Sequence, residues 1–131
     1  MIARTTALAI MTLATVPAAL AVDGFRKLSG AQIALTLGGM QFTDEVHWRQ
    51  VYGKDGTLRS FDMGRKDVGR WRIRGNEICT DLGDDGDNNC FEVWLRGNRL
   101  VMQRDAEDKF PNEGILEKPT EARPAVSGRK P

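Results

Sequence analysis

The sequence predicts a single, mainly β domain, an antiparallel meander of about six or seven strands with one short N-terminal helix. Turn-forming Gly, Asn and Asp residues recur at short intervals between Met40 and Asp105. The runs between these turns are about five to eight residues long and rich in Val, Ile, Phe, Trp and Thr, as in strands joined by hairpins. No helical period follows residue 40, which argues against a parallel sheet. We expect a twisted sheet or a partly closed barrel.

A short helix is predicted between Ser29 and Gly39. Ser29 can cap its first turn, and Gln32 stands three residues later, where a capping box requires it. Gly38 and Gly39 then end the helix, because glycine suits the residue that follows the last helical turn. The helix has an apolar side, which must be buried against the sheet. That side consists of Leu28, Ile33, Leu35 and Leu37.

Two segments, 71–78 and 94–100, carry the letters Arg-Gly-Asn between two strands. Gly-Asn suits a two-residue hairpin turn with positive φ, and such a turn fixes the register of both strands. A third pairing joins the strands on either side of the loop from 80 to 89. The expected opposite pairs are Arg74 with Glu77, Ile73 with Ile78, Arg72 with Cys79, Trp71 with Thr80, Arg70 with Asp81, Leu95 with Leu100, Trp94 with Val101, Val93 with Met102, Cys79 with Cys90 and Ile78 with Phe91. The three hairpins agree on one core face and place both cysteines and Trp94 on the opposite face.

The first 21 residues have the composition of a signal peptide. Arg4 is their only charge, an apolar run covers 5–16, and Pro17 ends that run. Ala19-Leu20-Ala21 then gives the small-x-small pattern of signal peptidase cleavage. We expect cleavage near Ala21, a periplasmic or secreted mature chain, and no stable membrane insertion afterwards. A membrane-anchored helix is the alternative, although the run is short for a bilayer.

Removing Arg4 with the leader reduces the 19 Lys and Arg residues to 18, which equals the 18 Asp and Glu residues. A chain without net charge argues against a nucleic-acid or anionic-membrane binder, so we expect no nucleic-acid partner. The expected organisation is one β domain over 22–110 and a separate tail over 111–131. That tail holds four of the five prolines and few large apolar residues, so we expect it to be extended or disordered.

Cys79 and Cys90 are the only cysteines, and an exported chain with an even number of cysteines most simply forms a disulfide. Closing so short a loop should stabilise the fold by roughly 2–3 kcal/mol. The alternatives are two free thiols or half of a metal site. The metal alternative lacks partners, because the single histidine, His47, is far away in the sequence.

The acidic segment 81–92 has the length of a calcium-binding EF-hand loop. Gly83 cannot supply the third ligand, Asn88 replaces an apolar anchor, and strands flank the loop where helices should. We therefore expect a solvated hairpin loop, with no metal and no other cofactor. The positions that match the calcium pattern are Asp81, Asp85, Gly86, Asp87, Asn89 and Glu92.

Arg70, Arg72 and Arg74 project from one face of a single strand and could hold a phosphate or a carboxylate. A solvated ion-pair face is the alternative, since acidic residues are predicted across from them. Trp94 and Val101 lie on the same non-core face. An exposed Trp94 would form a recognition patch, unless the helix or the N-terminal segment covers it.

His47 is expected to be exposed, because it alternates with Val46 and Trp48. None of the serines of the mature chain lies in a nucleophile-elbow motif, and so small a domain has little room for a deep cleft. No catalytic residue is therefore predicted. Convergent carboxylates around His47 would indicate an enzyme.

The stretch from Leu28 to Gln103 resembles small exported proteins of unknown function common in alphaproteobacteria. The resemblance rests on Leu28-Ser-Gly-Ala-Gln-Ile, Asp55-Gly-Thr, Gly69-Arg-Trp-Arg-Ile and Cys79 with Cys90-Phe-Glu-Val. It implies the periplasm and a disulfide-containing β fold, and it carries over no functional residue. Small periplasmic inhibitors of lysozymes or proteases share this architecture, which is an analogy of fold alone.

We therefore expect a non-enzymatic periplasmic binding or interaction protein. Its partner would be a protein or a small anionic ligand of the cell envelope, bound by the face with Trp94 and the three arginines. One alternative is an inhibitor of an envelope-targeting hydrolase, which would present a loop such as 80–89 to a cleft. A small hydrolase is the second alternative.

Overall fold

The computed structural model describes residues 24–83 and 89–120, which form one helix and nine strands. The predicted signal peptide, the middle of the acidic loop and the end of the tail lie outside the described residues. The elements are β1 (Arg26–Lys27), α1 (Gly30–Leu37), β2 (Met40–Thr43), β3 (Trp48–Tyr52), β4 (Thr57–Asp62), β5 (Arg65–Arg74), β6 (Glu77–Asp81), β7 (Cys90–Arg96), β8 (Arg99–Gln103) and β9 (Asn112–Glu117). Within the described residues, no helix is long and apolar enough to span a bilayer.

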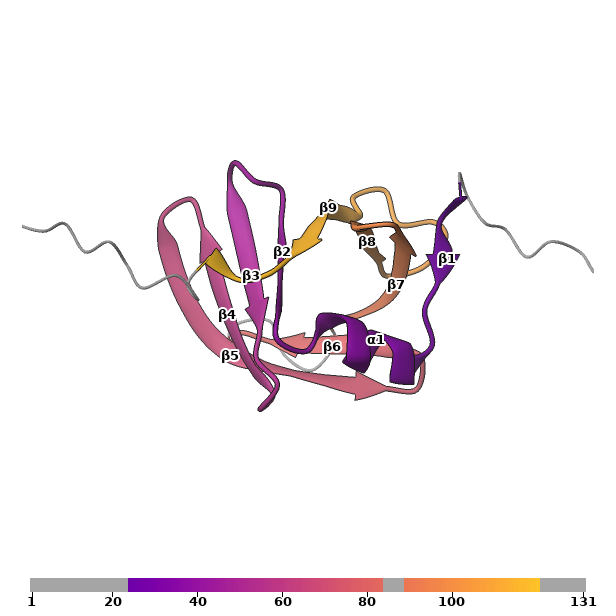
Figure 1. Cartoon of the computed structure of the whole chain (residues 1–131), viewed down its shortest axis with the longest axis horizontal. Coiled ribbons are helices and arrows are strands. Elements are labelled where there is room, and N and C mark those ends of the chain that lie inside the picture. The colour runs from indigo at the N-terminus through magenta and orange to yellow at the C-terminus, as the bar shows by residue number, and fades with distance from the viewer. Residues whose placement is uncertain (1–23, 84–88, 121–131) are drawn as a thin grey trace, which may run out of the picture.

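The strands from β2 to β9 form a closed antiparallel barrel (Figure 1). Each strand pairs with the next along the chain from β2 to β8, and β9 then returns between β8 and β2. The short strand β1 pairs outside this circuit with the far part of β7. The predicted antiparallel meander with one helix is confirmed, and the sheet closes fully, as a barrel of eight strands.

The strand registers predicted from the Gly-Asn turns are confirmed. All five expected pairs between β5 and β6 are present, from Arg74–Glu77 to Arg70–Asp81. The expected pairs of β7 with β8 and of β6 with β7 are present as well. Gly75 and Gly97 both have φ of +59°, a conformation that glycine reaches without strain.

The disulfide between Cys79 and Cys90 is confirmed and joins β6 to β7. Both cysteines are buried, but neither belongs to the main apolar cluster. The two residues therefore lie on the outer side of the barrel wall, as the register predicted, and are shielded from solvent there. The helix does not cover the disulfide, because the buried residues of the helix belong to the apolar cluster inside the barrel.

Helix α1 begins and ends where the sequence indicates. The Ser29 hydroxyl accepts from the Gln32 amide at 3.3 Å, and the Gln32 side chain accepts from the Ser29 amide at 2.8 Å. Ile33 and Leu37 are fully buried among inward-facing strand residues such as Ile78, whereas Leu35, which was expected on the same side, is 85% exposed. The helix therefore faces the barrel interior and does not cover Trp94 on the outer wall, which was one of the two expectations.

The segment after Pro111 differs from the expected disordered tail. Residues 112–117 form β9, which pairs with β2 and β8 and thereby closes the barrel. The domain boundary predicted at residue 110 was therefore wrong. Gly114 makes this pairing possible, because a side chain there would clash with the Thr43 carbonyl and the Phe42 ring. Residues 121–131 lie outside the described part.

Since the strands run alternately up and down, the turns between them gather at two ends of the barrel. We call one the helix end, where α1 reaches from the β5–β6 turn at Gly75 to the β3–β4 turn at Lys54. We call the other the loop end. The helix end comprises residues 24–39, 53–56, 74–77, 96–99 and 117–120, and the loop end comprises residues 44–47, 62–65, 81–83, 89 and 104–111.

Candidate functional site

The barrel interior changes from apolar to polar along its axis. Near the helix end it is filled by the apolar cluster around Tyr52 and Leu58. Register and strand alternation place polar side chains on the same inward face toward the loop end. These are Gln50, Ser60, Asp62, Asp67 and Asn112.

Trp48, the first residue of β3, borders the loop end and lines three hollows there. Its ring packs edge-on against the Phe42 ring, with centroids 4.8 Å apart, so its orientation is fixed from below. It is half-buried, and its indole N–H makes no hydrogen bond to another described residue. An anchored aromatic ring beside several hollows is a typical feature of a binding site.

The first hollow, which we call the mouth pocket, has a volume of about 140 Å³ and lies inside the barrel wall. It is lined by Trp48, Gln50, Ser60, Asp62 and Asn112. The Tyr52 hydroxyl donates to the Gln50 side-chain oxygen at 2.7 Å and so fixes that amide from the core side. Burial raises the pKa of the Tyr52 phenol, which therefore remains a donor at every physiological pH.

Ser60 is the most deeply placed polar residue of the mouth pocket. Only 7% of its surface is exposed, and its hydroxyl makes no hydrogen bond to another side chain or carbonyl of the described chain. Its neighbours across the sheet are Gln50 and Asp67. A buried hydroxyl of this kind is rare, because leaving it unpaired destabilises the fold by about 1–3 kcal/mol.

Charges near the mouth pocket nearly balance. Asp62 pairs across the strands with Arg65, whose guanidinium lies 3.0 Å from the Asp67 carboxylate. The pocket wall therefore carries one net negative charge, and the guanidinium is already engaged. Such a wall favours neutral or cationic groups over anions.

The second hollow, which we call the rim groove, has a volume of about 550 Å³ and shares Trp48 and Asn112 with the mouth pocket. It runs between the β2–β3 turn and the segment that leads into β9. Its other lining residues are Asp44, Lys109, Phe110, Pro111 and Glu113. The shared residues make the two hollows neighbours, so one extended ligand can occupy both.

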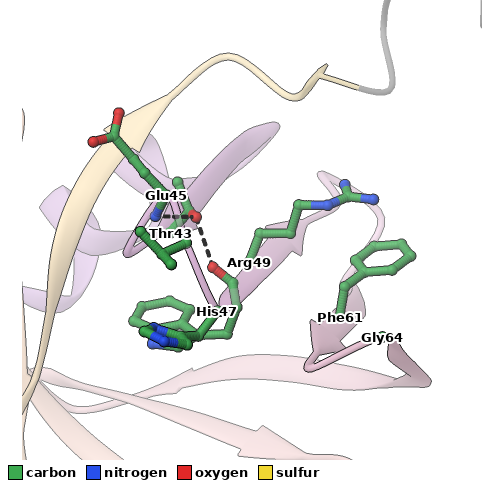
Figure 2. A pocket seen from close by; sticks show the side chains of 8 residues that line it. Thr43, Glu45, His47, Arg49, Phe61 and Gly64 are labelled. Carbon is green, nitrogen blue, oxygen red and sulfur yellow. Dashed lines mark hydrogen bonds between the residues drawn. The ribbon is translucent and has the colours of Figure 1, made fainter.

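The third hollow lies on the outer side of the rim, between the β2–β3 and β4–β5 turns (Figure 2). Figure 2 shows Arg49 reaching over the Phe61 ring, 3.7 Å from its centroid. The Thr43 hydroxyl donates to the Trp48 carbonyl and accepts from the Glu45 amide, so it is fully used by the turn. This hollow has a volume of about 180 Å³ and ends at Gly64.

Asp44 organises the turn that carries this rim. Its carboxylate accepts from the amides of Val46, His47 and Trp48, and it lies 2.8 Å from His47 Nδ1. Desolvation raises the pKa of Asp44, but these hydrogen bonds outweigh it and hold the pKa well below its usual range. The turn is therefore rigid while Asp44 is ionised.

Three large apolar side chains protrude from separate loops of this rim. Val46, Met63 and Phe110 are 79%, 76% and 87% exposed. The Met63 amide donates to the His47 carbonyl at 3.0 Å and ties two of these loops together. Glu45 and Met63 both have positive φ, at 72° and 49°, which is unusual for residues with side chains. Exposed apolar groups and backbone strain at one place are typical of a functional surface.

The two ends of the barrel carry opposite charge, although the chain as a whole has a formal net charge of only +1. Among described residues, the loop end has seven acidic and three basic side chains, and the helix end has seven basic and three acidic ones. The loop-end residues are Asp44, Glu45, Asp62, Asp81, Asp105, Glu107 and Asp108 against Arg65, Arg104 and Lys109. A partner that docks at the loop end therefore meets a negative, partly apolar rim.

The predicted arginine row lies on the outer wall of β5, away from these hollows. Arg70, Arg72 and Arg74 are exposed. The acidic residues predicted opposite Arg74 and Arg70 are in register, but neither Arg72 nor Arg74 lies within ion-pair distance of a described carboxylate. Arg70 donates to the Asp55 carbonyl at 3.4 Å. Among the described residues, Arg72 and Arg74 therefore form an exposed basic strip without the ion pairs that were the alternative.

Trp94 is not fully exposed. It is half-buried, and its indole N–H donates to the Glu92 carboxylate at 3.3 Å. Lys27 of β1 pairs with Trp94 and forms an ion pair of 2.9 Å with Glu92, so the N-terminal segment borders it. Arg72 is the cross-strand neighbour of Cys79, and Cys79 is the neighbour of Cys90 on β7. Trp94 lies four residues further along β7, so the disulfide separates it from the arginines.

His47 is exposed, and a carboxylate does lie beside it. That carboxylate, Asp44, is however occupied by three backbone amides. Within the described chain no hydroxyl or thiol is hydrogen-bonded to His47 to act as a nucleophile. Only the ends of the calcium-like loop are described, and there Asp81 bonds to the Gly83 amide while Glu92 pairs with Lys27. No cluster of three potential metal ligands occurs among residues 24–83 and 89–120.

The sequence did not indicate Trp48, Gln50, Ser60 or Asn112 as site residues. The usable signal was the alternation of β3 and β4, which places Gln50 and Ser60 on the core face of their strands. A polar residue on a core face is the sequence mark of a polar cavity. Asn112 carries no such signal, because the proline-rich composition of its segment predicts a tail and not a strand.

No protein-family model matches the chain, no curated protein is detectably similar to it, and no solved structure matches it.

Proposed function

We propose that the protein is a non-enzymatic binding protein of the cell envelope that takes its partner at the loop end of the barrel. The observation that carries this proposal is the group of exposed apolar side chains, Val46, Met63 and Phe110, around the anchored ring of Trp48. Exposed apolar side chains scattered singly are ordinary, whereas a group around a groove marks a recognition surface.

The envelope location rests on the predicted signal peptide and on the disulfide. A disulfide between Cys79 and Cys90 persists in an oxidising compartment such as the periplasm. The resemblance to small exported alphaproteobacterial proteins points the same way. Detection of the processed chain in a periplasmic fraction, beginning near Val22, tests this part of the proposal.

The test of the binding end is a comparison of retention by matched variants. The oxidised chain, exported with its own leader and tagged, is immobilised and exposed to a periplasmic extract. We expect wild type and the control L35S/V68S to retain the same component, and V46S/M63S/F110S to lose it. Leu35 and Val68 are exposed apolar residues away from the loop end, so the control matches the change in surface polarity. Equal retention by all three proteins would contradict the loop end as the binding end.

The exposed strip of Arg72 and Arg74 offers a second surface for an anionic ligand, because neither guanidinium forms an ion pair with a carboxylate of the described residues. The double variant R72A/R74A and the single variant W94A separate it from the loop end. Loss of retention in either variant, with V46S/M63S/F110S unaffected, would move the binding site to this outer wall.

Inhibition of an envelope-targeting hydrolase is the second candidate function. The acidic, apolar rim favours it, because a basic enzyme would be attracted to the loop end and its cleft would accept the protruding Phe110. Egg-white lysozyme, a basic hydrolase, is a suitable first probe. Inhibition by wild type that weakens steeply with salt and is lost in V46S/M63S/F110S would favour this candidate.

A small hydrolase is the remaining alternative, and His47 is its obvious general base. Mass spectrometry of the retained component, before and after incubation with the protein, distinguishes a hydrolase from a binding protein. Conversion of that component by wild type but not by H47A would replace the non-enzymatic proposal.

A further inference from the structure

We propose that the mouth pocket binds one sugar ring of a glycan chain, with the chain continuing along the rim groove. This inference rests on the proposed function, because it takes the loop end as the binding end. It adds the chemical class of the ligand, and it concerns the pocket formed by Trp48, Gln50, Ser60, Asp62 and Asn112.

The first argument is the unpaired hydroxyl of Ser60. It is 7% exposed, it lines the pocket, and it has no hydrogen-bond partner among the described residues. A hydroxyl can both donate and accept, so it is satisfied best by a ligand group that does the same. Sugar hydroxyls have this property.

The second argument is the set of polar groups that converge on the same space. The Gln50 oxygen is taken by Tyr52, which leaves its NH₂ group as a donor. Asp62 supplies acceptors only, and Asn112 supplies both donors and an acceptor. Planar amides and carboxylates can bridge two neighbouring hydroxyls of one ring, because their paired atoms have a matching spacing.

Trp48 supplies the apolar part of the site. Its ring is fixed against Phe42 and borders the pocket, so one face of a sugar ring, which presents C–H groups, can pack on it. A ligand held by an aromatic ring on one side and by polar groups around its edge is oriented in one way. That combination favours a polyhydroxylated ring over a flexible chain.

Charge and polarity disfavour other ligand classes. An anion would face Asp62 and Asp67, and the guanidinium of Arg65, which stands opposite Asp62, already bonds to Asp67. An apolar ligand would leave Ser60 and the Gln50 amide unpaired. A cation is the serious competitor, but Arg65 opposite Asp62 weakens its attraction.

The size of the hollows predicts a chain and not a free monosaccharide. The mouth pocket, at about 140 Å³, has room for a single ring. Trp48 and Asn112 also line the adjoining rim groove of about 550 Å³, which gives further rings a continuous path past Phe110. A trimer should therefore bind more tightly than a monomer.

The test is a titration of the oxidised, isotopically labelled protein followed by ¹⁵N–¹H spectra. The probes are N-acetylglucosamine, its linear trimer, maltotriose and mannotriose, with the diamine putrescine as the cationic competitor. We expect one of the trimers to shift the indole signal of Trp48 and the side-chain amide signals of Gln50 and Asn112. The indole signals of Trp71 and Trp94 should stay in place, because they are bonded to Gly53 and Glu92.

S60A and N112A should each weaken trimer binding by about tenfold, whereas V68A on the outer wall should not weaken it. S60A should leave the urea midpoint unchanged or raise it, since it removes an unpaired buried hydroxyl. This combination separates a ligand contact from a structural role.

The outcomes also separate this inference from the proposed function. Retention that depends on Val46, Met63 and Phe110, together with no shift by any sugar, would overturn the sugar site and leave the binding end standing. Shifts of the three pocket signals by putrescine alone would overturn it in favour of a cation site. Loss of both the retention and the sugar shifts would overturn the proposed function as well.

Discussion

Gly30, the first residue of α1, packs directly against the backbone carbonyl of Gly75 in the turn between β5 and β6. A Cβ atom at position 30 would collide with that oxygen and with the Ile73 side chain. The Gly30 amide also donates to the Asn76 side chain at 2.9 Å, so the same turn caps the helix. The Gly-Asn turn that sets the strand register therefore also holds the helix on the barrel.

We expect G30A to destabilise the protein by about 2 kcal/mol, because alanine overpacks this contact although it is the better helix former. Urea unfolding followed by circular dichroism measures the effect. The control is L35A, which changes an exposed position of the same helix and should shift stability by less than about 0.5 kcal/mol. Equal stability of G30A and L35A would mean that the helix is not docked on the turn.

Removing the disulfide should be the most destabilising change on the outer wall. In C79A/C90A we expect the free energy of unfolding to fall by about 3 kcal/mol, because the unfolded chain regains the freedom of a loop with 11 residues of separation. Burial of both cysteines favours alanine over serine as the replacement. The reduced wild type, unfolded in urea with dithiothreitol, should behave like the double variant. A double variant as stable as the oxidised wild type would contradict the prediction.

Asp44 should make the rim of the loop end sensitive to acid. Its pKa in the folded protein is lowered, so its hydrogen bonds stabilise the fold fully above the unfolded pKa of about 4 and progressively less as pH falls. We therefore expect the urea midpoint of wild type to fall more steeply than that of D44N between about pH 5 and 2. Asparagine retains an oxygen for the turn amides but does not titrate.

The matched control for this experiment is E45Q, which removes a carboxylate from the same turn without touching the amide bonds of Asp44. Its acid dependence should resemble that of wild type. If D44N and E45Q respond identically to acid, the loss would belong to the net charge of the loop end and not to Asp44.

The hairpins could be predicted from the sequence because each is a local unit. Arg-Gly-Asn fixes a turn, and the turn fixes the register of the two strands that it joins. The third pairing, across the loop from 80 to 89, places Cys79 opposite Cys90. The helix was equally local, since Ser29, Gln32 and Gly38 carry its limits. The two hairpins each have one apolar face, and these faces together indicate where the core lies.

The loop-end site could not be predicted in this way, because it depends on closure of the barrel. Trp48 and Asn112 meet only when β9 returns to β2, and nothing local in the sequence announces that pairing. The arginine row was visible because it lies along one strand. A site formed by one strand is therefore easier to predict from a sequence than a site formed by several strands. This holds whether the ligand binds at the arginine row or at the loop end.

Closure by β9 leads to a last prediction, which concerns the boundary of the domain. A chain ended after residue 110 lacks β9, so the edges of β2 and β8 are unpaired and Leu116 is missing from the core. We expect this chain to lose cooperative unfolding, since an open edge and a partly exposed core remain. A chain ended after Thr120 retains β9 and the bonds from Thr120 to Gln41, and should unfold at the same temperature as the full chain.

Differential scanning calorimetry of both truncated chains decides the point, with G114A as the full-length variant that disturbs the same strand next to Thr43. A cooperative transition in the chain of 110 residues would show that β9 contributes nothing to the fold and would restore the shorter domain that the prolines suggested.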